Sequence, residues 1–297
     1  MANIIFTLTY DGESSERAQI DFYDVAIALV GFQRSLSLTT HLILNDEVIT
    51  QSTALKGAKI YALPPEEGSW KINAAVILGG LYTIGTTPAG TPLGNLVRSA
   101  YDYVISESLG FHVDYEKSLG QQYEEFNSQK GQIEYLDQSR FDSVIEKCEA
   151  AVRDIHRPIV KSKTANSAKI IFKSEEKQIL IGKEFNNGTY EYVSETRTSD
   201  ISFVLVGKIS SYNINTFKGR IYLPVERRPV PFELVENARK RKNYDLLLGS
   251  MAINAQNRND DGALLALEAF KNTSRSGQLK GLYVVDVQRL SELDIFR

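Results

Sequence analysis

The sequence has one cysteine and three histidines among its 297 residues. Cys148 therefore has no partner within the chain for a disulfide bond. His41, His112 and His156 lie far apart and have no His-x-x-x-His or Cys-x-x-Cys companion, which leaves too few ligands for the usual zinc sites. We expect no metal ion and no cofactor, and we expect hydrophobic burial alone to stabilise the fold.

The sequence also lacks the short motifs of the common enzyme classes. It contains no Gly-x-x-x-x-Gly-Lys-Ser/Thr loop, no dinucleotide-binding glycine fingerprint and no Gly-x-Ser-x-Gly elbow. Cys148 falls on a predicted amphipathic helix, where it is interpreted as a small buried apolar residue. We predict a protein without catalytic residues, and an active site assembled from distant carboxylates remains the alternative.

No strong charge of one sign and no leader-like segment is present. Lys and Arg total 34 against 37 Asp and Glu, so there is no global attraction to nucleic acid or anionic lipid. The first residues lack a basic stretch followed by an apolar one, which favours a cytoplasmic protein.

Residues 72–97 carry no charge but hold five glycines and two prolines. We interpret them as a buried strand or short helix followed by a loop; a membrane-inserting or oligomerising element is the alternative.

The first half predicts a mixed α/β domain. Residues 3–10 are rich in β-branched and aromatic side chains and end at Asp11-Gly12, which predicts a strand and a turn. Asp21 precedes a helix over about 22–44, whose apolar positions recur every three or four residues. Gly31 interrupts this helix, which indicates close approach of another element. We further predict an antiparallel strand pair over 57–63 and 69–78, and helices over 92–109 and 139–155.

The second half predicts a small β-barrel. Pro158 ends a helix and a polar run follows it, so we place a border near residue 160, between domains 1–160 and 161–297. Short strands are expected at 168–173, 178–182, 189–193, 201–211, 217–223 and 231–234, then helices over 236–256 and 261–272 and a closing strand over 279–287. The fold class is therefore α+β, with a barrel of the OB or SH3-like kind.

Local positive charge is the feature that departs most from background. Residues 218–242 hold eight basic and three acidic side chains, a local charge of +5, with Tyr212, Phe217 and Tyr222 nearby. This pattern indicates a surface that holds phosphates while aromatic rings stack on bases. A solvated helix start over a barrel core and an acidic protein partner are the alternatives. The candidate nucleic-acid-binding residues are Lys218, Arg220, Arg227, Arg228, Arg239, Lys240, Arg241 and Lys242.

Several stretches carry a resemblance to a known family. They are Asp11-Gly12, residues 28–36 (ALVGFQRSL), 55–58 (LKGA), 68–70 (GSW), 207–213 (GKISSYN) and 218–221 (KGRI). Together they span most of the chain, which resembles an uncharacterised bacterial family associated with mobile-element and phage-defence gene neighbourhoods. The resemblance implies an α/β region followed by a small barrel, and it supplies no catalytic residue.

These observations predict a non-enzymatic binding or assembly subunit, expected from the resemblance to act beside a separate effector protein in a bacterial phage-defence system. Its basic C-terminal surface is the first candidate for binding, with nucleic acid as the ligand. The alternative is a homo-oligomeric scaffold or partner-binding protein that acts through the apolar face of the 22–44 helix and the uncharged 72–97 segment. A membrane-active effector and a cryptic enzyme are lesser alternatives.

Overall fold

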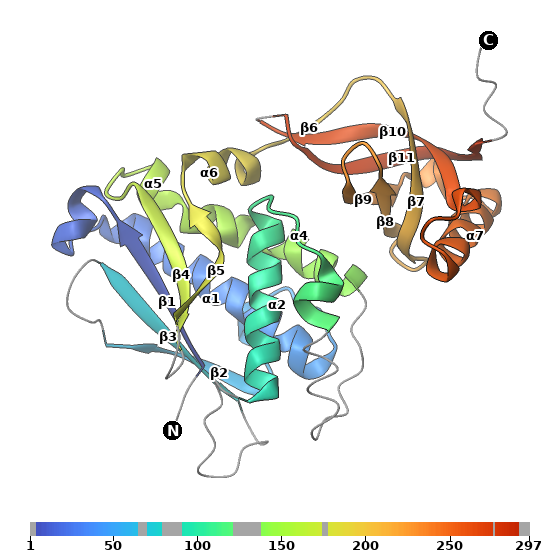
Figure 1. The fold of residues 1–297 in the computed structure, drawn as a ribbon. Coiled ribbons are helices and arrows are strands. Elements are labelled where there is room, and N and C mark those ends of the chain that lie inside the picture. Colours follow the sequence, from blue (N-terminus) through green and yellow to red (C-terminus); the bar gives the residue numbers. More distant parts are fainter. Residues whose placement is uncertain are drawn as a thin grey trace. The chain divides into compact units, whose positions relative to one another are not determined.

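The computed structural model divides the chain into two compact units, Met1–Val193 and Ser194–Arg297 (Figure 1). It describes residues 4–64, 70–78, 91–120, 138–173, 178–275 and 277–290. Each unit has its own hydrophobic core.

The N-terminal unit is built on a five-stranded antiparallel sheet in the order β2-β3-β1-β4-β5. Its strands are β1 (Ile4–Asp11), β2 (Ala58–Leu63), β3 (Lys71–Leu78), β4 (Ser167–Lys173) and β5 (Gln178–Phe185). The expected strand at 3–10 is thus the central one. The expected pairing of 57–63 with 69–78 is also confirmed, as β2 with β3. Side chains in β4 alternate between buried and partly exposed, as in a sheet with one face against a core.

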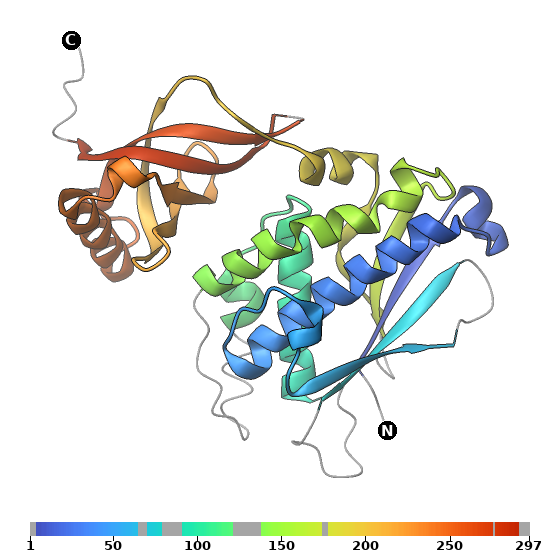
Figure 2. The same cartoon turned by 180° about the vertical axis from the view of Figure 1, so that it is seen from behind.

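Helices pack against the sheet and against each other. They are α1 (Phe22–Asn45), α2 (Pro92–Ser108), α4 (Gln138–Ile155), the single turn α5 (Arg157–Val160) and α6 (Asn187–Ser194), and α1 and α4 lie side by side across one face of the sheet (Figure 2). The Asp21 carboxylate accepts a hydrogen bond from the Asp24 amide and begins α1, as predicted. Gly31 allows the close approach that the sequence indicated, because an added Cβ would lie 2.4 Å from the Ala151 carbonyl oxygen on α4.

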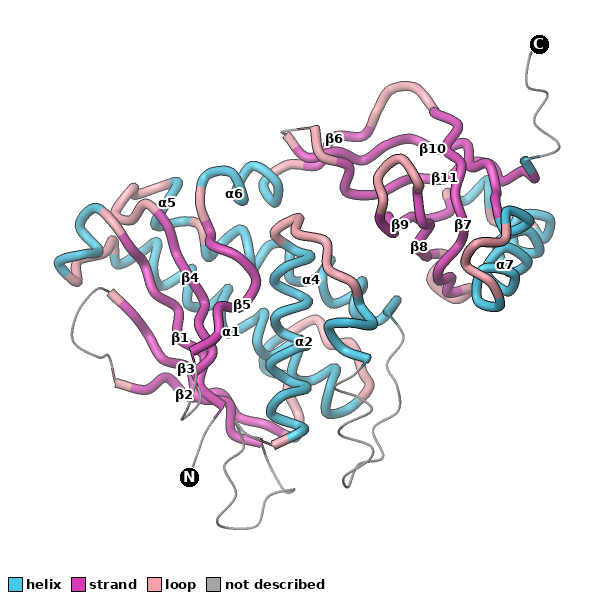
Figure 3. The backbone as a smooth tube through the Cα atoms, in the orientation of Figure 1, coloured by secondary structure: helices cyan, strands magenta, loops and turns pink. Residues whose placement is uncertain are grey.

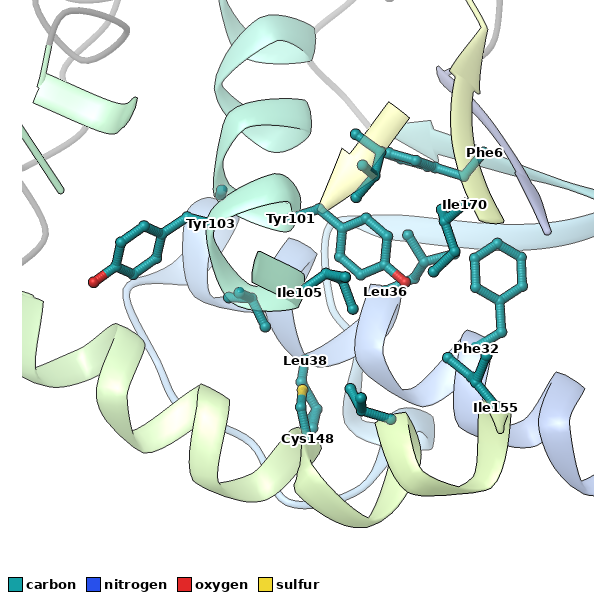
Figure 4. Close-up of a cluster of buried hydrophobic side chains, with 14 of the residues drawn as sticks. Phe6, Phe32, Leu36, Leu38, Tyr101, Tyr103, Ile105, Cys148, Ile155 and Ile170 are labelled. Carbon is teal, nitrogen blue, oxygen red and sulfur yellow. The ribbon is translucent and has the colours of Figure 1, made fainter. Parts of the chain in front are cut away.

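The core of this unit is rich in aromatic side chains, several of which Figure 4 labels. The rings of Phe6 and Tyr101 meet edge to face with their centroids 5.0 Å apart. The Tyr101 hydroxyl lies 2.8 Å from the Ser35 hydroxyl, and the Tyr10 hydroxyl donates to the Ile155 carbonyl oxygen. The largest rings of the core therefore also satisfy their polar groups.

In the C-terminal unit five strands pair into a closed barrel, and helices accompany them. Figure 3 colours these strands and helices along the backbone. Its elements are β6 (Thr196–Thr198), β7 (Phe203–Asn213), β8 (Lys218–Leu223), β9 (Arg228–Leu234), α7 (Arg241–Gln256), β10 (Leu264–Ser274) and β11 (Leu279–Arg289). Strands β7, β8 and β9 form a meander, β11 runs parallel to β9, and β10 pairs with both β11 and β7. The barrel strands are β7, β8, β9, β10 and β11 in chain order, and α7 lies between the third and the fourth. The third and fifth strands, β9 and β11, are parallel. This is the strand order of an OB-fold.

The border between the units lies after Val193 rather than near residue 160, where the sequence placed it. The prediction was wrong because the strands at 168–173 and 178–182 were assigned to the barrel. In the structure β4 pairs with β1 along its whole length, and β5 follows β4 as the sheet edge. A pattern of alternating side chains identifies a strand but does not identify its sheet.

Two other expectations are corrected. Residues 189–193 form part of helix α6, because Asn186 and Thr189 exchange hydrogen bonds between the side chain of each and the amide of the other. Residues 264–274 form strand β10 where a helix over 261–272 was expected, because pairing with β7 and β11 outweighs the helical tendency of Leu, Ala and Glu.

The uncharged segment 72–97 is described only in part. Its first residues belong to β3 and its last to α2, and residues 79–90 lie outside the described residues. Among the described helices, α1 has the length and composition of a membrane span, and 67% of its most apolar window is buried within the unit.

Candidate nucleic-acid interface

The outer face of the barrel is set by the pairing of β8 with its neighbours. Ile221 and Leu223 of β8 enter the core, so the alternation of a strand turns Lys218, Arg220 and Tyr222 to the outside. The register places Lys218 opposite Glu233 of β9, and Glu233 is in turn opposite Tyr283 of β11. On the other edge of β8, strand β7 places Lys208 opposite Tyr222, Ser211 opposite Arg220 and Asn213 opposite Lys218.

The structure separates the eight candidate basic residues into groups. Lys218 and Arg239 meet at one end of the β8–β9 hairpin, where both contact the Glu233 carboxylate, at 3.8 and 3.5 Å. Arg227 and Arg228 lie beyond the other end of β8, so the full length of the strand separates them from Lys218. The sequence stretch is therefore not one continuous basic patch.

Arg239 has a structural role at the end of the barrel. Its Nε donates to the Leu234 carbonyl oxygen over 3.1 Å, and its guanidinium lies 4.3 Å from the centre of the Phe217 ring. Phe217 continues a column of stacked rings that runs through Tyr244 and Tyr212, with centroids 6.2 and 6.4 Å apart. Two of the aromatic residues that the sequence associated with base stacking, Phe217 and Tyr212, thus pack against the barrel core.

Arg220 is also withdrawn from solvent, since only 3% of it is exposed although β8 turns it outward. Lys240, Arg241 and Lys242, in contrast, are exposed at the start of α7. Arg241 contacts Asp245 one turn along the helix. Both side chains of this pair are exposed, so the contact adds little stability. Cations at a helix N-terminus oppose the helix dipole, so these three basic side chains are not placed there for the stability of α7.

Two exposed tyrosines complete the outer face. Tyr222 is 39% exposed and lies on β8, the strand that carries Lys218. Tyr283 is 40% exposed and lies on β11, opposite Glu233 of β9. Opposite Arg220 on β7, the Ser211 hydroxyl is buried and makes no hydrogen bond within the described part of the chain. The sequence reasoning named Tyr222 but missed Tyr283, which the strand alternation of residues 279–287 could have placed opposite the buried Val284.

Three titratable side chains of the N-terminal unit are buried or half-buried, and the pKa of each is shifted by burial. Burial raises the pKa of the Cys148 thiol to about 12, so it is not a thiolate nucleophile. Burial lowers the pKa of His156 to about 4, and its Nδ1 donates to the Val152 carbonyl oxygen. Burial raises the pKa of Asp102, whose carboxylate accepts from the Gly182 amide over 2.7 Å. Within the described residues, no group of three His, Cys, Asp or Glu side chains could hold a metal ion.

The oligomeric alternative relies on two surfaces, the apolar face of the 22–44 helix and the uncharged segment 72–97. The apolar face of the 22–44 helix, with Val25, Ala28, Phe32 and Leu36, is buried in the core of the N-terminal unit, so it is not offered to a partner. The uncharged segment has two apolar stretches. Residues 74–78 belong to β3 and are mostly buried, and residues 81–84 lie outside the described residues.

Comparisons with known proteins agree with the division into two units. Residues 6–193 match the model of a domain of unknown function (DUF7946), and residues 204–288 match that of a second family of unknown function (DUF7947). No curated protein and no solved structure matches the chain. The first match spans more than half of the sequence and coincides with the N-terminal unit, and the chain belongs to the family that this domain of unknown function, DUF7946, defines.

Proposed function

We propose that the protein is a non-enzymatic binding subunit whose barrel binds single-stranded nucleic acid across the outer face of β8, β9 and β11. The observation that carries the proposal is the pair of exposed tyrosines, Tyr222 and Tyr283, on one face of a barrel with the OB strand order. OB-folds bind oligonucleotides on the face of their second and third strands, and base stacking on aromatic rings tolerates any sequence.

The charges around this face support a ligand with phosphates. Arg227 is exposed at one end of the β8–β9 hairpin, and Lys240, Arg241 and Lys242 are exposed at the start of α7, which follows the other end. A strand of nucleic acid laid over the tyrosines would have its phosphates near basic side chains at both ends. Lys218 and Arg239 share Glu233, so they contribute less positive charge to the surface than the sequence suggested.

The setting in a bacterial phage-defence system, with a separate effector as partner, is kept as part of this proposal. It is supported by the family resemblance of the sequence alone. Cytoplasmic nucleic acid is the ligand that this setting would offer.

Fluorescence anisotropy of a labelled single-stranded oligonucleotide tests the proposal. The Tyr222→Ala, Tyr283→Ala double variant should bind at least about fivefold more weakly, since one stacked base contributes about 1–3 kcal/mol. Tyr61→Ala is the matched control, because Tyr61 is 47% exposed on β2 of the N-terminal unit. Equal affinity of the double variant and the control would refute the stacking face.

Salt dependence separates the phosphate contacts from the stacking. The Arg241→Gln, Lys242→Gln variant should reduce the slope of log K against log[salt] by about 0.7 for each phosphate contact that is lost. The tyrosine variant should leave that slope unchanged while lowering the affinity. Binding of an acidic protein but of no oligonucleotide would assign the surface to a protein partner and overturn the proposal.

A further inference from the structure

An apolar stripe runs along the solvent side of the first half of α1, opposite the face that enters the core. We define the α1 stripe as Phe22, Tyr23, Ala26 and Val30, which recur at helical spacing and are all exposed. Phe22 is 86%, Tyr23 67% and Val30 64% exposed. Such large apolar side chains exposed together on one helix face are unusual for a surface that only meets water.

A surface pocket lies beside the α1 stripe. A hollow of about 510 Å³ opens between α1 and the segment before it, and Ile20, Phe22, Leu29 and Trp70 are among its lining residues. An opposing apolar surface can therefore enter beside the helix instead of resting on a convex ridge. At these exposures the two aromatic side chains, of about 150–250 Å² each, offer on the order of 300 Å² per copy, and Val30 and Ala26 add on the order of 150 Å². Complete burial of the α1 stripe in two copies would approach the roughly 1,000 Å² of a specific interface.

The charges at the two ends of the α1 stripe are opposite in sign. Before its first residue Glu13, Glu16 and Asp21 are exposed together with Arg17, a net charge of −2. Arg34 follows its last residue and interacts electrostatically with Asp154 of α4. The Arg34 Nε is buried without a hydrogen-bond partner in the described part of the chain. An antiparallel arrangement of two α1 helices brings the acidic end of each copy against Arg34 of the other, whereas a parallel arrangement opposes like charges.

We propose that the α1 stripe is a self-association surface, on which a second copy of this chain docks with its α1 antiparallel. With the helices crossing midway between Ala26 and Val30, each Val30 fits against the small Ala26 of the other copy. Each Phe22 then faces the Arg34 end of the opposing stripe. The interface is two-fold symmetric and so closes as a dimer. It involves only the N-terminal unit and does not depend on the proposed binding of nucleic acid.

Sedimentation velocity of the full chain over a range of concentrations, without nucleic acid, tests the surface. Wild type should show a concentration-dependent dimer, and Val30→Glu should raise its dissociation constant at least about tenfold, because it places a charge in an apolar interface. Val225→Glu is the matched control, since Val225 is 93% exposed in the β8–β9 turn of the barrel unit. Circular dichroism melting checks that both variants stay folded. A wild type that is monomeric wherever it is soluble, or a dimer equally stable in both variants, would overturn the proposal.

Disulfide cross-linking tests the direction of the helices. Ala26→Cys and Val30→Cys are made as separate variants with tags of different size, and the native Cys148 is buried and does not interfere. An antiparallel crossing brings position 26 of one copy to position 30 of the other, so the mixed pair should cross-link faster than either variant with itself. Faster self-cross-linking of both variants would indicate parallel helices and contradict the proposed arrangement.

Discussion

The core of the N-terminal unit and the outer face of the barrel differ in how they use tyrosine. In the N-terminal unit Tyr10 and Tyr101 are fully buried and their hydroxyls have hydrogen-bond partners inside the core. In the barrel Tyr222 and Tyr283 stand on the outer face, and the buried Tyr212 hydroxyl has no partner among the described residues. The Tyr10 and Tyr101 hydroxyls thus contribute to the structure of the core, whereas Tyr222 and Tyr283 lie on the face that we propose binds nucleic acid.

Ion pairs show the same contrast and give the largest expected effect. The Asp24 carboxylate is buried, lies 2.8 Å from Arg157 Nη2 and accepts the Ser162 amide over 3.0 Å. Asp24→Asn should lower the free energy of unfolding by about 3 kcal/mol, because Arg157 loses its partner in a mostly buried site. Asp245→Asn, which removes an exposed partner of Arg241, should cost less than about 1 kcal/mol. Urea unfolding measures the free energy of unfolding of both variants. Equal losses in the two variants would contradict the difference between the buried and the exposed ion pair.

Acid should weaken the N-terminal unit through His156. Its pKa is about 4 in the folded protein against 6.5 for the free side chain, because the ring is buried. The unfolded chain therefore binds the proton first, so stability is complete above pH 6.5 and is lost as the pH falls toward 4. The loss amounts to about 1.4 kcal/mol per pH unit, roughly 3 kcal/mol in total.

The His156→Gln variant isolates this contribution. The difference in unfolding free energy between wild type and variant should shrink as the pH falls from 6.5 to about 4, whatever the other groups contribute. A difference that stays constant across this range would show that His156 binds its proton equally well in both states.

Two helix glycines give the smallest effects, and the effects have opposite signs. A Cβ at Gly31 of α1 would meet the Ala151 carbonyl oxygen, so Gly31→Ala should destabilise the protein by about 1–3 kcal/mol despite the better helix propensity of alanine. Gly249 of α7 has nothing within 4 Å of its added Cβ. Gly249→Ala should stabilise the barrel by about 0.5–1 kcal/mol. Thermal unfolding measures the change in stability of each variant. Changes of the same sign in the two variants would contradict the prediction.

Local patterns in the sequence predicted most elements of the N-terminal unit. The expected helix over 22–44 is α1 to within one residue, and its Asp21 cap and the close packing at Gly31 are confirmed. These features depend on interactions within a few residues or on a single steric requirement. The assignment of β4 and β5 to the first sheet depends on pairing with β1, which lies at the far end of this unit's sequence, and no local pattern contains that pairing.

The candidate site was predicted less well than the fold. A run of basic residues reveals charge, but their partners come from other strands and turns: Glu233 is shared by Lys218 and Arg239, and Phe217 lies under Arg239. Burial of Arg220 is likewise a property of the assembled barrel. The exposed start of α7 was visible in the sequence because no tertiary contact was needed to recognise it.

The central place of β1 in its sheet governs how the N-terminal unit forms as the ribosome makes the chain. β1 is made before both strands that pair with it, and β3 can pair with one of its edges early. Its other edge keeps unpaired amides and carbonyls until β4 is synthesised, well after β3. During that interval the nascent protein exposes one edge of the strand that becomes the centre of the sheet. Termination after β3 but before residue 167 would therefore release a product with an open, aggregation-prone sheet.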